Sequence, residues 1–268
     1  MKLSYKILAI VFLLMAGLIS CYEDLNMVYT HSAEPVVAIE AILTDTYKPF
    51  VVLLSKSTAM DDTAEYQEID SALVFLSNSS DWRIQLKKTA TGTYETDSMQ
   101  AQVGETYKLE VQVDGKWYYA IEKLLPCKIV DSLYVINLTN SIVYEDGLYI
   151  MVKLSIPNEN VAFYRAVVSN NDSVYNTYND LLLFETSFVK DETEVLFPYP
   201  FISGDSVVIR AYSISERMFE YFNAYARITQ GLTTPSSLPM QNPPTNIIGG
   251  AVGYFQVSSV TISSIKIH

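Results

Sequence analysis

Short apolar runs separated by turn residues recur along the chain and constrain its fold more than any other feature. The clearest case is the segment 108–113, in which polar and apolar residues alternate, followed by the aromatic run 117–119. Asp114 and Gly115 stand between them, and an Asp-Gly step suits a tight hairpin because both central residues adopt positive φ there. Strict alternation is typical of a half-buried strand. The sequence therefore predicts an antiparallel hairpin at this point.

The same spacing predicts an all-β chain. In the first half we expect strands at 36–43, 50–57, 71–77, 82–88, 107–113 and 117–124. In the second half we expect strands at 132–138, 148–156, 162–170, 181–188, 194–197 and 206–213. The 20 Tyr and 11 Phe residues suit pleated surfaces. Pro126 interrupts the pattern, so we predict two tandem β-sandwich domains, Ig-like or transthyretin-like, at 35–127 and 128–268.

One stretch departs from the β pattern. Between residues 215 and 230, large apolar residues recur at three- and four-residue steps, which predicts an amphipathic helix. Ser215 can cap its start and Gly231 can end it. The apolar stripe consists of Met218, Tyr221, Phe222, Tyr225 and Ile228. Such a stripe usually packs on a sheet, and we favour that interpretation over a ligand-binding or partner-binding surface.

The N-terminus is typical of an export signal. Lys2 and Lys6 precede an apolar core at 7–14, which is too short to cross a bilayer as a stable helix. The segment 18–21, Leu-Ile-Ser-Cys, then resembles the lipobox of bacterial lipoproteins. We expect a signal peptide at 1–20, a lipid such as palmitate on Cys21, and a tether at 21–34. The alternative is an ordinary signal peptide followed by a chance cysteine. Lipidation would anchor the protein to a membrane without spanning it.

Charge restricts the class of partner. The chain has 18 Lys and Arg against 30 Asp and Glu, a net charge of −12. Such a surface repels nucleic acid, so we expect no nucleic-acid partner. Glu23 and Asp24 resemble the short acidic surface-export signal of Bacteroidota lipoproteins. They favour an outer-membrane protein that faces the cell exterior, with a periplasm-facing orientation as the alternative.

The C-terminal segment 242–255 is the most distinctive string in the sequence. Its signature residues are Asn242, Pro243, Pro244, Asn246, Gly249, Gly250, Gly253, Tyr254 and Phe255. Proline bars helix, and glycine permits positive φ or close backbone approach, so a structural clasp is the favoured interpretation. A phosphate-binding loop is the alternative, but it needs a following helix with Lys and Ser or Thr. Here residues 254–257 continue as a strand pattern instead.

This segment resembles the closing signature of a Bacteroidota lipoprotein family, domain-of-unknown-function family 4249. Weaker motifs in the same order extend the resemblance over the mature chain. They are the lipobox and the segments 40–45, 92–94, 104–107 and 204–207. The resemblance implies a cell-surface or outer-membrane lipoprotein, often associated with TonB-dependent transport systems.

Catalytic and metal-binding candidates are weak. The two histidines, His31 and His268, lie near the ends of the chain, where neither favours a catalytic dyad or a metal site. Cys127 has no positioned histidine base and is interpreted as a buried thiol. Gly204-Asp205-Ser206 lacks the second glycine of a nucleophile elbow and is read as a turn. The acidic group at 61–68 lacks the spacing of a calcium loop. We expect no catalytic residues, no metal and no cofactor.

Six tripeptides resemble the O-glycosylation acceptor of exported Bacteroidota proteins. The acceptor residues would be Thr63, Ser71, Ser98, Ser132, Ser173 and Ser206. An Asp-Ser step at a turn entering a strand produces the same tripeptide for structural reasons.

Two functions from different classes follow. The favoured one is a non-enzymatic surface lipoprotein that binds a ligand or docks on an outer-membrane TonB-dependent transporter through loops on a rigid scaffold. The alternative is a structural or adhesive subunit of fimbrial type, which requires strand donation between subunits.

Overall fold

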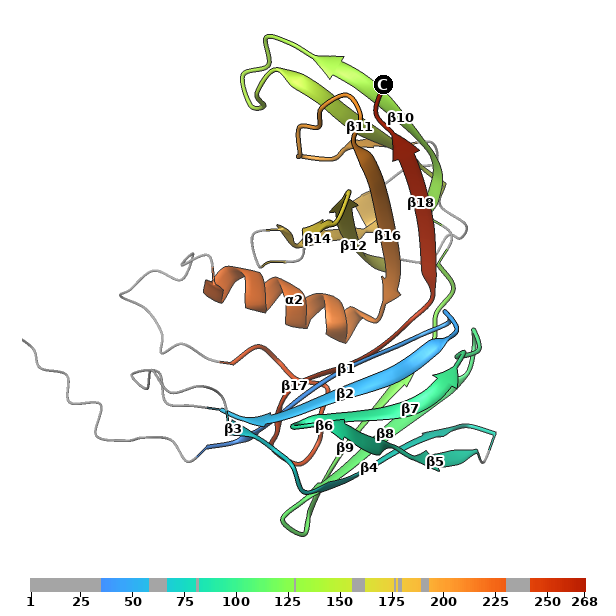
Figure 1. Cartoon of the computed structure of the whole chain (residues 1–268), viewed down its shortest axis with the longest axis vertical. Helices are drawn as coiled ribbons and strands as arrows, with labels where there is room; N and C mark the ends of the chain where they lie inside the picture. Colours follow the sequence, from blue (N-terminus) through green and yellow to red (C-terminus); the bar gives the residue numbers. More distant parts are fainter. Residues whose placement is uncertain are drawn as a thin grey trace, which may run out of the picture. The chain divides into compact units, whose positions relative to one another are not determined.

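Strands and turns dominate the part of the chain that the computed structural model describes (Figure 1). The described residues are 35–57, 67–80, 82–127, 129–155, 162–175, 177, 180–188, 193–229 and 242–268. Within them, strands form four sheets accompanied by one α-helix, so the predicted all-β class with a C-terminal helix is confirmed. The predicted signal peptide and tether, with Cys21, Glu23 and Asp24, lie outside the described residues. Thr63 and the acidic residues at 61–65 also lie outside them.

Two sheets enclose a first core. Sheet A has the strand order β17 (Val252–Ser258), β1 (Val37–Thr44), β2 (Lys48–Lys56), β7 (Thr93–Met99) and β6 (Lys87–Ala90), with β3 (Gln67–Glu68) beside β2. Sheet B has the order β5 (Arg83–Gln85), β4 (Ala72–Asn78), β8 (Thr106–Val113) and β9 (Lys116–Lys123). Alternate residues of both sheets meet in one buried cluster that includes Leu43, Val74 and Leu109. This pairing of inner faces is a β-sandwich.

Two further sheets enclose a second core. Sheet C has the order β10 (Val130–Leu138), β11 (Gly147–Leu154) and β15 (Glu194–Leu196). Sheet D has the order β13 (Ser173–Tyr175), β12 (Phe163–Asn170), β16 (Ser206–Ile214) and β18 (Val260–Lys266), with β14 (Leu182–Glu185) also paired to β12. Their shared cluster includes Ile150, Val168 and Ile209. Along the chain, core membership changes between Leu124 and Cys127.

The helix α2 (Glu216–Thr229) follows β16 directly. Ser215 caps it as predicted, because its Oγ accepts the backbone N–H of Met218 at 3.3 Å. Met218 and Phe222 are buried against Ile214, so this part of the predicted stripe packs on the sheets. No helix among the described residues has both the length and the apolarity needed to cross a bilayer.

The predicted Asp-Gly hairpin is confirmed. Strands β8 and β9 pair antiparallel, with Val113 opposite Lys116 at the turn. Asp114 and Gly115 have φ of 50° and 81°, which is the conformation that this two-residue turn demands.

The last strands join sheets that were built from earlier parts of the chain. Strand β17 pairs parallel with β1, from Ala38 opposite Val252 to Thr44 opposite Ser258. Strand β18, immediately after it, pairs with β16 in sheet D. The C-terminal segment therefore contributes one strand to each core. A division of the chain at residue 127 would assign both strands to the second domain. Pro35 to His268 form one compact unit, and the predicted two-domain division stays a prediction.

Other differences from the predicted strands have local causes. The segment 82–88 is two strands, because Leu86 turns into the first core and donates its N–H to Val74 O at 2.9 Å. Strand β5 then belongs to sheet B and β6 to sheet A. The segment 181–188 ends as a 3-10 helix, Thr186–Phe188. Four strands were not predicted, namely β3, β7, β13 and β18.

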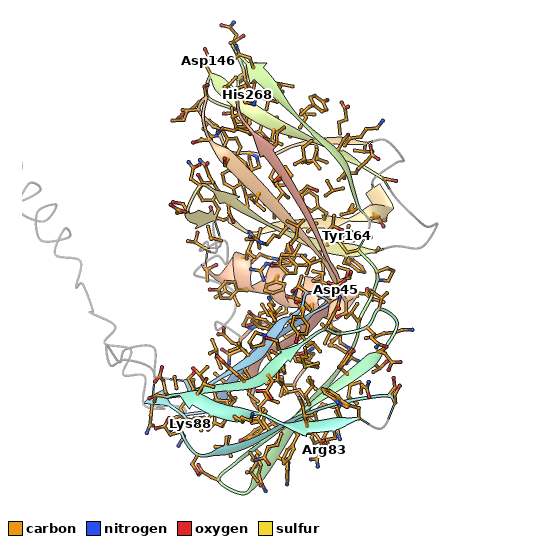
Figure 2. All side chains as sticks on the ribbon, turned by 45° about the vertical axis from the view of Figure 1, so that its right-hand side comes forward. Asp45, Arg83, Lys88, Asp146, Tyr164 and His268 are labelled. Carbon is orange, nitrogen blue, oxygen red and sulfur yellow. The ribbon has the colours of Figure 1, made fainter. Side chains whose placement is uncertain are left out.

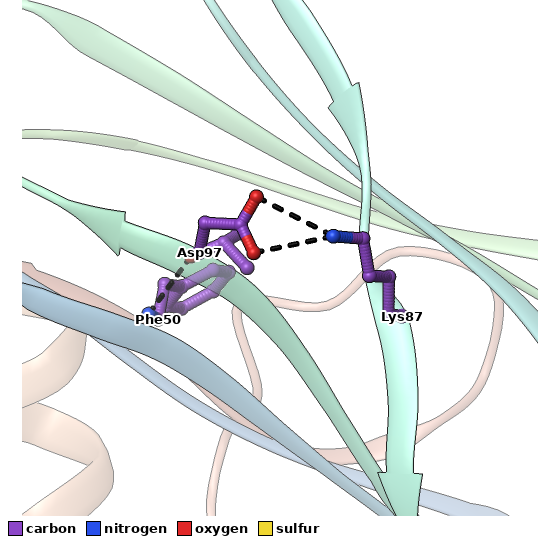
Figure 3. A network of polar contacts seen from close by, with 4 residues as sticks. Phe50, Lys87 and Asp97 are labelled. Carbon is purple, nitrogen blue, oxygen red and sulfur yellow. Dashed lines mark hydrogen bonds and ion pairs between the residues drawn. The ribbon is translucent and has the colours of Figure 1, made fainter.

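Two polar contacts of sheet A are drawn in Figure 3, and one of them lies at a bulge between β2 and β7. The ladder shifts between Pro49 and Val51, and the N–H of Phe50 donates to the buried Thr96 Oγ1 at 3.0 Å instead. Nearby, Lys87 Nζ bonds both oxygens of Asp97, at 3.2 and 3.4 Å. Both charged side chains are mostly exposed, so this ion pair contributes little to stability.

Polar side chains link the end of β1 to the connection between β17 and β18. Asp45, labelled in Figure 2, accepts the N–H of Val260 at 2.9 Å and the hydroxyl of Ser259. Ser213 Oγ donates to Leu125 O at 2.6 Å and accepts the N–H of Ser259 at 3.1 Å. These bonds satisfy backbone groups where the chain passes from one core to the other.

We expect truncation of Phe255 to destabilise the whole fold. Its side chain is fully buried in the first core and packs edge-on against Phe50, with ring centroids 6.1 Å apart. Phe255→Ala should lower the free energy of unfolding by about 3–5 kcal/mol, measured by urea titration. Ile262→Ala, at an exposed position of β18, is the control and should change stability by less than about 0.5 kcal/mol. Equal stability of the two variants would contradict this role for β17.

Candidate functional site

The clasp, residues 242–255, is organised around the buried side chain of Asn246. Its Nδ2 donates to Glu122 Oε1 at 2.8 Å and to the carbonyl oxygen of Phe255 at 2.7 Å, while its Oδ1 accepts the Phe255 N–H at 3.0 Å. Thr245 Oγ1 donates to the carbonyl oxygen of Gly253 at 2.7 Å. The clasp is therefore a loop whose two ends are bonded to each other and to β9.

Backbone contacts explain two of the clasp glycines. Gly249 has φ of 117°, and a Cβ there would lie 2.8 Å from the carbonyl oxygen of Trp117. Gly253 has φ of 94°, and a Cβ there would overlap the carbonyl group of Ile39 in β1. Next to Gly249, Ile248 exchanges two backbone hydrogen bonds with Tyr119, at 3.1 and 2.8 Å. Both glycines thus let the clasp approach neighbouring backbone closely.

Glu122 is the charged group of the clasp. It is a buried carboxylate on β9, and desolvation raises its pKa. Hydrogen bonds from Asn246 and Ser215, together with the positive charge of Arg217, oppose that shift. The same carboxylate therefore connects the clasp to the start of α2.

Neighbouring residues of β17 lie in different environments, because successive side chains of a strand point to opposite faces of the sheet. Phe255 enters the first core, whereas Tyr254 packs against α2. Strand β1 alternates in the same way, with Ile39 and Ala41 in the core. Glu40 is the register partner of Tyr254, so the two side chains stand on the same face.

A cavity of about 400 Å³, which we call the α2 cavity, lies on that face. Its lining residues are Glu40, Arg165, Thr177, Leu181, Tyr221, Phe222, Tyr225 and Tyr254. The ring centroids of Tyr221 and Tyr254 are 5.1 Å apart, and those of Phe222 and Tyr254 are 5.4 Å apart. Tyr221 and Tyr225 are parallel at 6.5 Å. Its volume falls within the usual range of small-molecule sites.

Two opposite charges border the α2 cavity. Arg165 is a buried residue of β12, and its guanidinium carbon lies 4.5 Å from the centroid of the Phe222 ring. Glu40 keeps part of its side chain in solvent, yet the surrounding residues desolvate its carboxylate and raise its pKa. Desolvation raises the pKa of Tyr254 to about 12, to which the nearby charge of Glu40 adds. The tyrosine hydroxyl therefore stays protonated at neutral pH.

The lining offers aromatic rings and polar groups that a ligand could contact. Glu40 is its carboxylate, and desolvation raises the pKa of the Tyr221 and Tyr254 hydroxyls, which are therefore hydrogen-bond donors at neutral pH. Among the described residues, no three His, Cys, Asp or Glu side chains gather as metal ligands would. The cavity can stack a ligand between rings and bond its polar groups at either end.

A larger hollow of about 760 Å³ is a weaker candidate. It is bordered by polar residues of β6, of β8 and of the segment just before β4, including Lys88, Gln112 and Asp70. Lys88 Nζ already pairs with Asp70 Oδ1 at 3.0 Å, and both side chains are largely exposed. Its charged groups satisfy each other in solvent, so a ligand would have to compete with water for them.

The structure also places the other residues that the sequence analysis considered as candidate sites. Cys127 is buried as predicted, and its Sγ contacts Ala211 O at 3.2 Å. Burial raises its thiol pKa, which disfavours the reactive thiolate. Asp205 forms the predicted turn into β16 and accepts hydrogen bonds from Asn170, Asn171 and the Ile202 N–H. His268 is exposed. Every described acceptor serine is exposed, namely Ser71, Ser98, Ser132, Ser173 and Ser206.

The sequence singles out the rings of the α2 cavity, but as a packing stripe and a structural clasp rather than as a ligand site, and it does not single out Arg165. Tyr221, Phe222 and Tyr225 belong to the predicted helical stripe, and Tyr254 belongs to the signature. Arg165 was not singled out, although it is the one charged residue in the apolar segment 162–170. A lone arginine in a strand pattern is the signal that could have indicated it, because buried charges need special surroundings.

We expect Glu122 to stabilise the fold as a hydrogen-bond acceptor for Asn246 rather than through its negative charge. Glu122→Gln keeps an acceptor for Asn246 and removes a desolvated charge, so it should be at least as stable as the wild type above neutral pH. Since the folded pKa is raised, the wild type loses stability as pH rises through that pKa, and this variant should lose less. Glu122→Ala leaves Asn246 unsatisfied and should cost about 1–3 kcal/mol. Thermal unfolding of both variants from about pH 4, near the ordinary carboxyl pKa, to about pH 8 checks this, and a stable Glu122→Ala variant would contradict it.

Three solved structures are similar to this chain at 13% sequence identity or less. A two-domain fibronectin type III segment of chicken tenascin is 10% identical, covers 67% of this chain and 91% of its own, and has a TM-score of 0.22. The FN1-FN3 domains of chicken CNTN1 are 13% identical over 68% of this chain and 62% of theirs, with a TM-score of 0.26. The BSP domain of a biofilm-associated protein is 9% identical over 84% of this chain and 29% of its own, with a TM-score of 0.25.

No curated protein sequence matches the chain significantly. One family model matches residues 23–264, which is most of the chain including the clasp and the α2 cavity, and its description is "Domain of unknown function (DUF4249)". The chain therefore belongs to the DUF4249 family.

Proposed function

We propose that this protein is a non-enzymatic, lipid-anchored cell-envelope protein that binds a small ligand in the α2 cavity and docks on an outer-membrane TonB-dependent transport system. The cavity is the observation that carries the proposal. Four aromatic rings surround a space of about 400 Å³ with Arg165 and Glu40 at its border. The signature residue Tyr254 is one of these rings. Its neighbour Phe255 is part of the first core, so the fold holds the cavity wall in place.

The membrane anchor rests on the N-terminal sequence. Lys2 and Lys6, the short apolar core and Cys21 support lipidation, and Glu23 and Asp24 support display on the cell exterior. The fimbrial-type alternative stays a prediction. We prefer ligand binding because a formed cavity serves a small molecule and has no part in strand donation between subunits.

Replacing the lipidated residue tests the anchor. Cys21→Ala should move the protein from the membrane fraction to the soluble fraction, because a lipid is the proposed attachment. Cys127→Ala, which changes the other cysteine, is the control and should remain in the membrane fraction. Fractionation with immunoblotting measures both. Continued membrane association of Cys21→Ala would overturn the lipid anchor.

Affinity capture tests the partnership. The tagged protein should recover an outer-membrane transporter barrel from detergent-solubilised membranes, identified by mass spectrometry against an untagged strain. Protease treatment of intact cells should also digest the protein if it faces outward. A capture that contains no transporter would remove the docking part of the proposal, and ligand binding would then be judged on the cavity alone.

A further inference from the structure

Four aromatic rings line the α2 cavity, and they lie at several angles to one another. Tyr221 and Tyr225 are nearly parallel, at an interplanar angle of 5°, while Tyr254 is tilted by 52° to Tyr221. Phe222 meets Tyr254 edge to face at 63°. Rings that surround a space from several directions form an aromatic cage, which attracts a positive charge because each ring face is electrically negative.

Glu40 adds a full negative charge to this cage. It lines the cavity beside its register partner Tyr254, and its charge adds to the desolvation that raises the pKa of Tyr221 and Tyr254. Desolvation is the one cause of its own raised pKa, and no ion pair in the described part of the chain includes it. A carboxylate desolvated without a nearby cation is unfavourable, and a bound cation would relieve that cost.

Arg165 does not supply the missing charge. Its guanidinium stacks on Phe222 and affects the pKa of Tyr254, but it is not among the causes of the Glu40 shift. Glu40 is therefore the carboxylate of the lining, and no ion pair among the described residues neutralises it.

From this arrangement we propose that the α2 cavity binds an organic cation with an ammonium or quaternary ammonium head group, held between Glu40 and the rings of Tyr221, Tyr225 and Tyr254. The net charge of −12 would raise the local concentration of such a ligand. This inference rests on the proposed ligand-binding function and names the ligand's chemical class.

Comparing choline with its uncharged isostere 3,3-dimethyl-1-butanol distinguishes recognition of the positive charge from recognition of the shape. Both are titrated into the full lipidated chain in detergent by isothermal titration calorimetry. Choline should bind about tenfold more tightly than the isostere, because the cage and Glu40 recognise its charge. Equal binding of the two would overturn the cationic class while leaving ligand binding in the cavity intact.

Matched variants locate the site. Glu40→Gln should weaken choline binding by about tenfold and leave the isostere unchanged, since it removes charge and keeps size. Tyr225→Leu, which removes a partly exposed ring, should weaken choline to a smaller degree. Glu220→Gln is the control, because this exposed residue of α2 is not part of the cavity lining, and it should bind choline as the wild type does.

Thermal unfolding of each variant verifies that it is folded. Choline binding that is unaffected by Glu40→Gln would overturn the proposal. The absence of any choline binding in the folded wild type would overturn it as well. Capture of a transporter is an independent measurement, so failure of the cation proposal can be told apart from failure of the docking proposal.

Discussion

The parallel pairing of β1 with β17 is the interaction on which the rest of the structure depends. It joins a segment near the start of the described chain to one near its end, from Ala38 opposite Val252 to Thr44 opposite Ser258. Gly253 makes it possible, because any Cβ at this position would overlap the carbonyl group of Ile39. Parallel strands require a long connection. Here the intervening chain forms that connection, and it includes sheets B and C and the strands of sheet D other than β18.

The consequences of this pairing extend to both faces of sheet A. On one face, Phe255 completes the first core beside Phe50. On the other, Tyr254 stands beside Glu40 and meets the rings of α2. A strand held in register on one face by a packed core cannot slip without moving the other face as well. The wall of the α2 cavity is therefore as firmly placed as the core behind it.

Buried polar groups hold the clasp and the connection between the cores in one arrangement. Asn246 makes one hydrogen bond to Glu122 on β9 and two to the backbone of Phe255 within the clasp, and Asp45 accepts two from Ser259 and Val260. Each satisfies groups that burial would otherwise leave without water. The signature glycines act with them, since close backbone approach brings these donors and acceptors within reach. The most distinctive string in the sequence thus has a structural role, and its Tyr254 alone lines the cavity.

Features set by near neighbours could be predicted from the sequence. The Asp114-Gly115 turn determined the β8–β9 hairpin, and Ser215 with the three- and four-residue apolar steps determined α2, because turn and cap chemistry act within a few residues. Strand periodicity also indicated which side chains share a face. It could not indicate which strands become neighbours: β17 beside β1, and β5 and β6 in different sheets, follow from long-range packing. Only the tertiary structure could bring Glu40, Arg165 and the rings of α2 to one cavity. The two-residue alternation of a strand shows which side chains share a face of the sheet, but it does not show which element packs against that face.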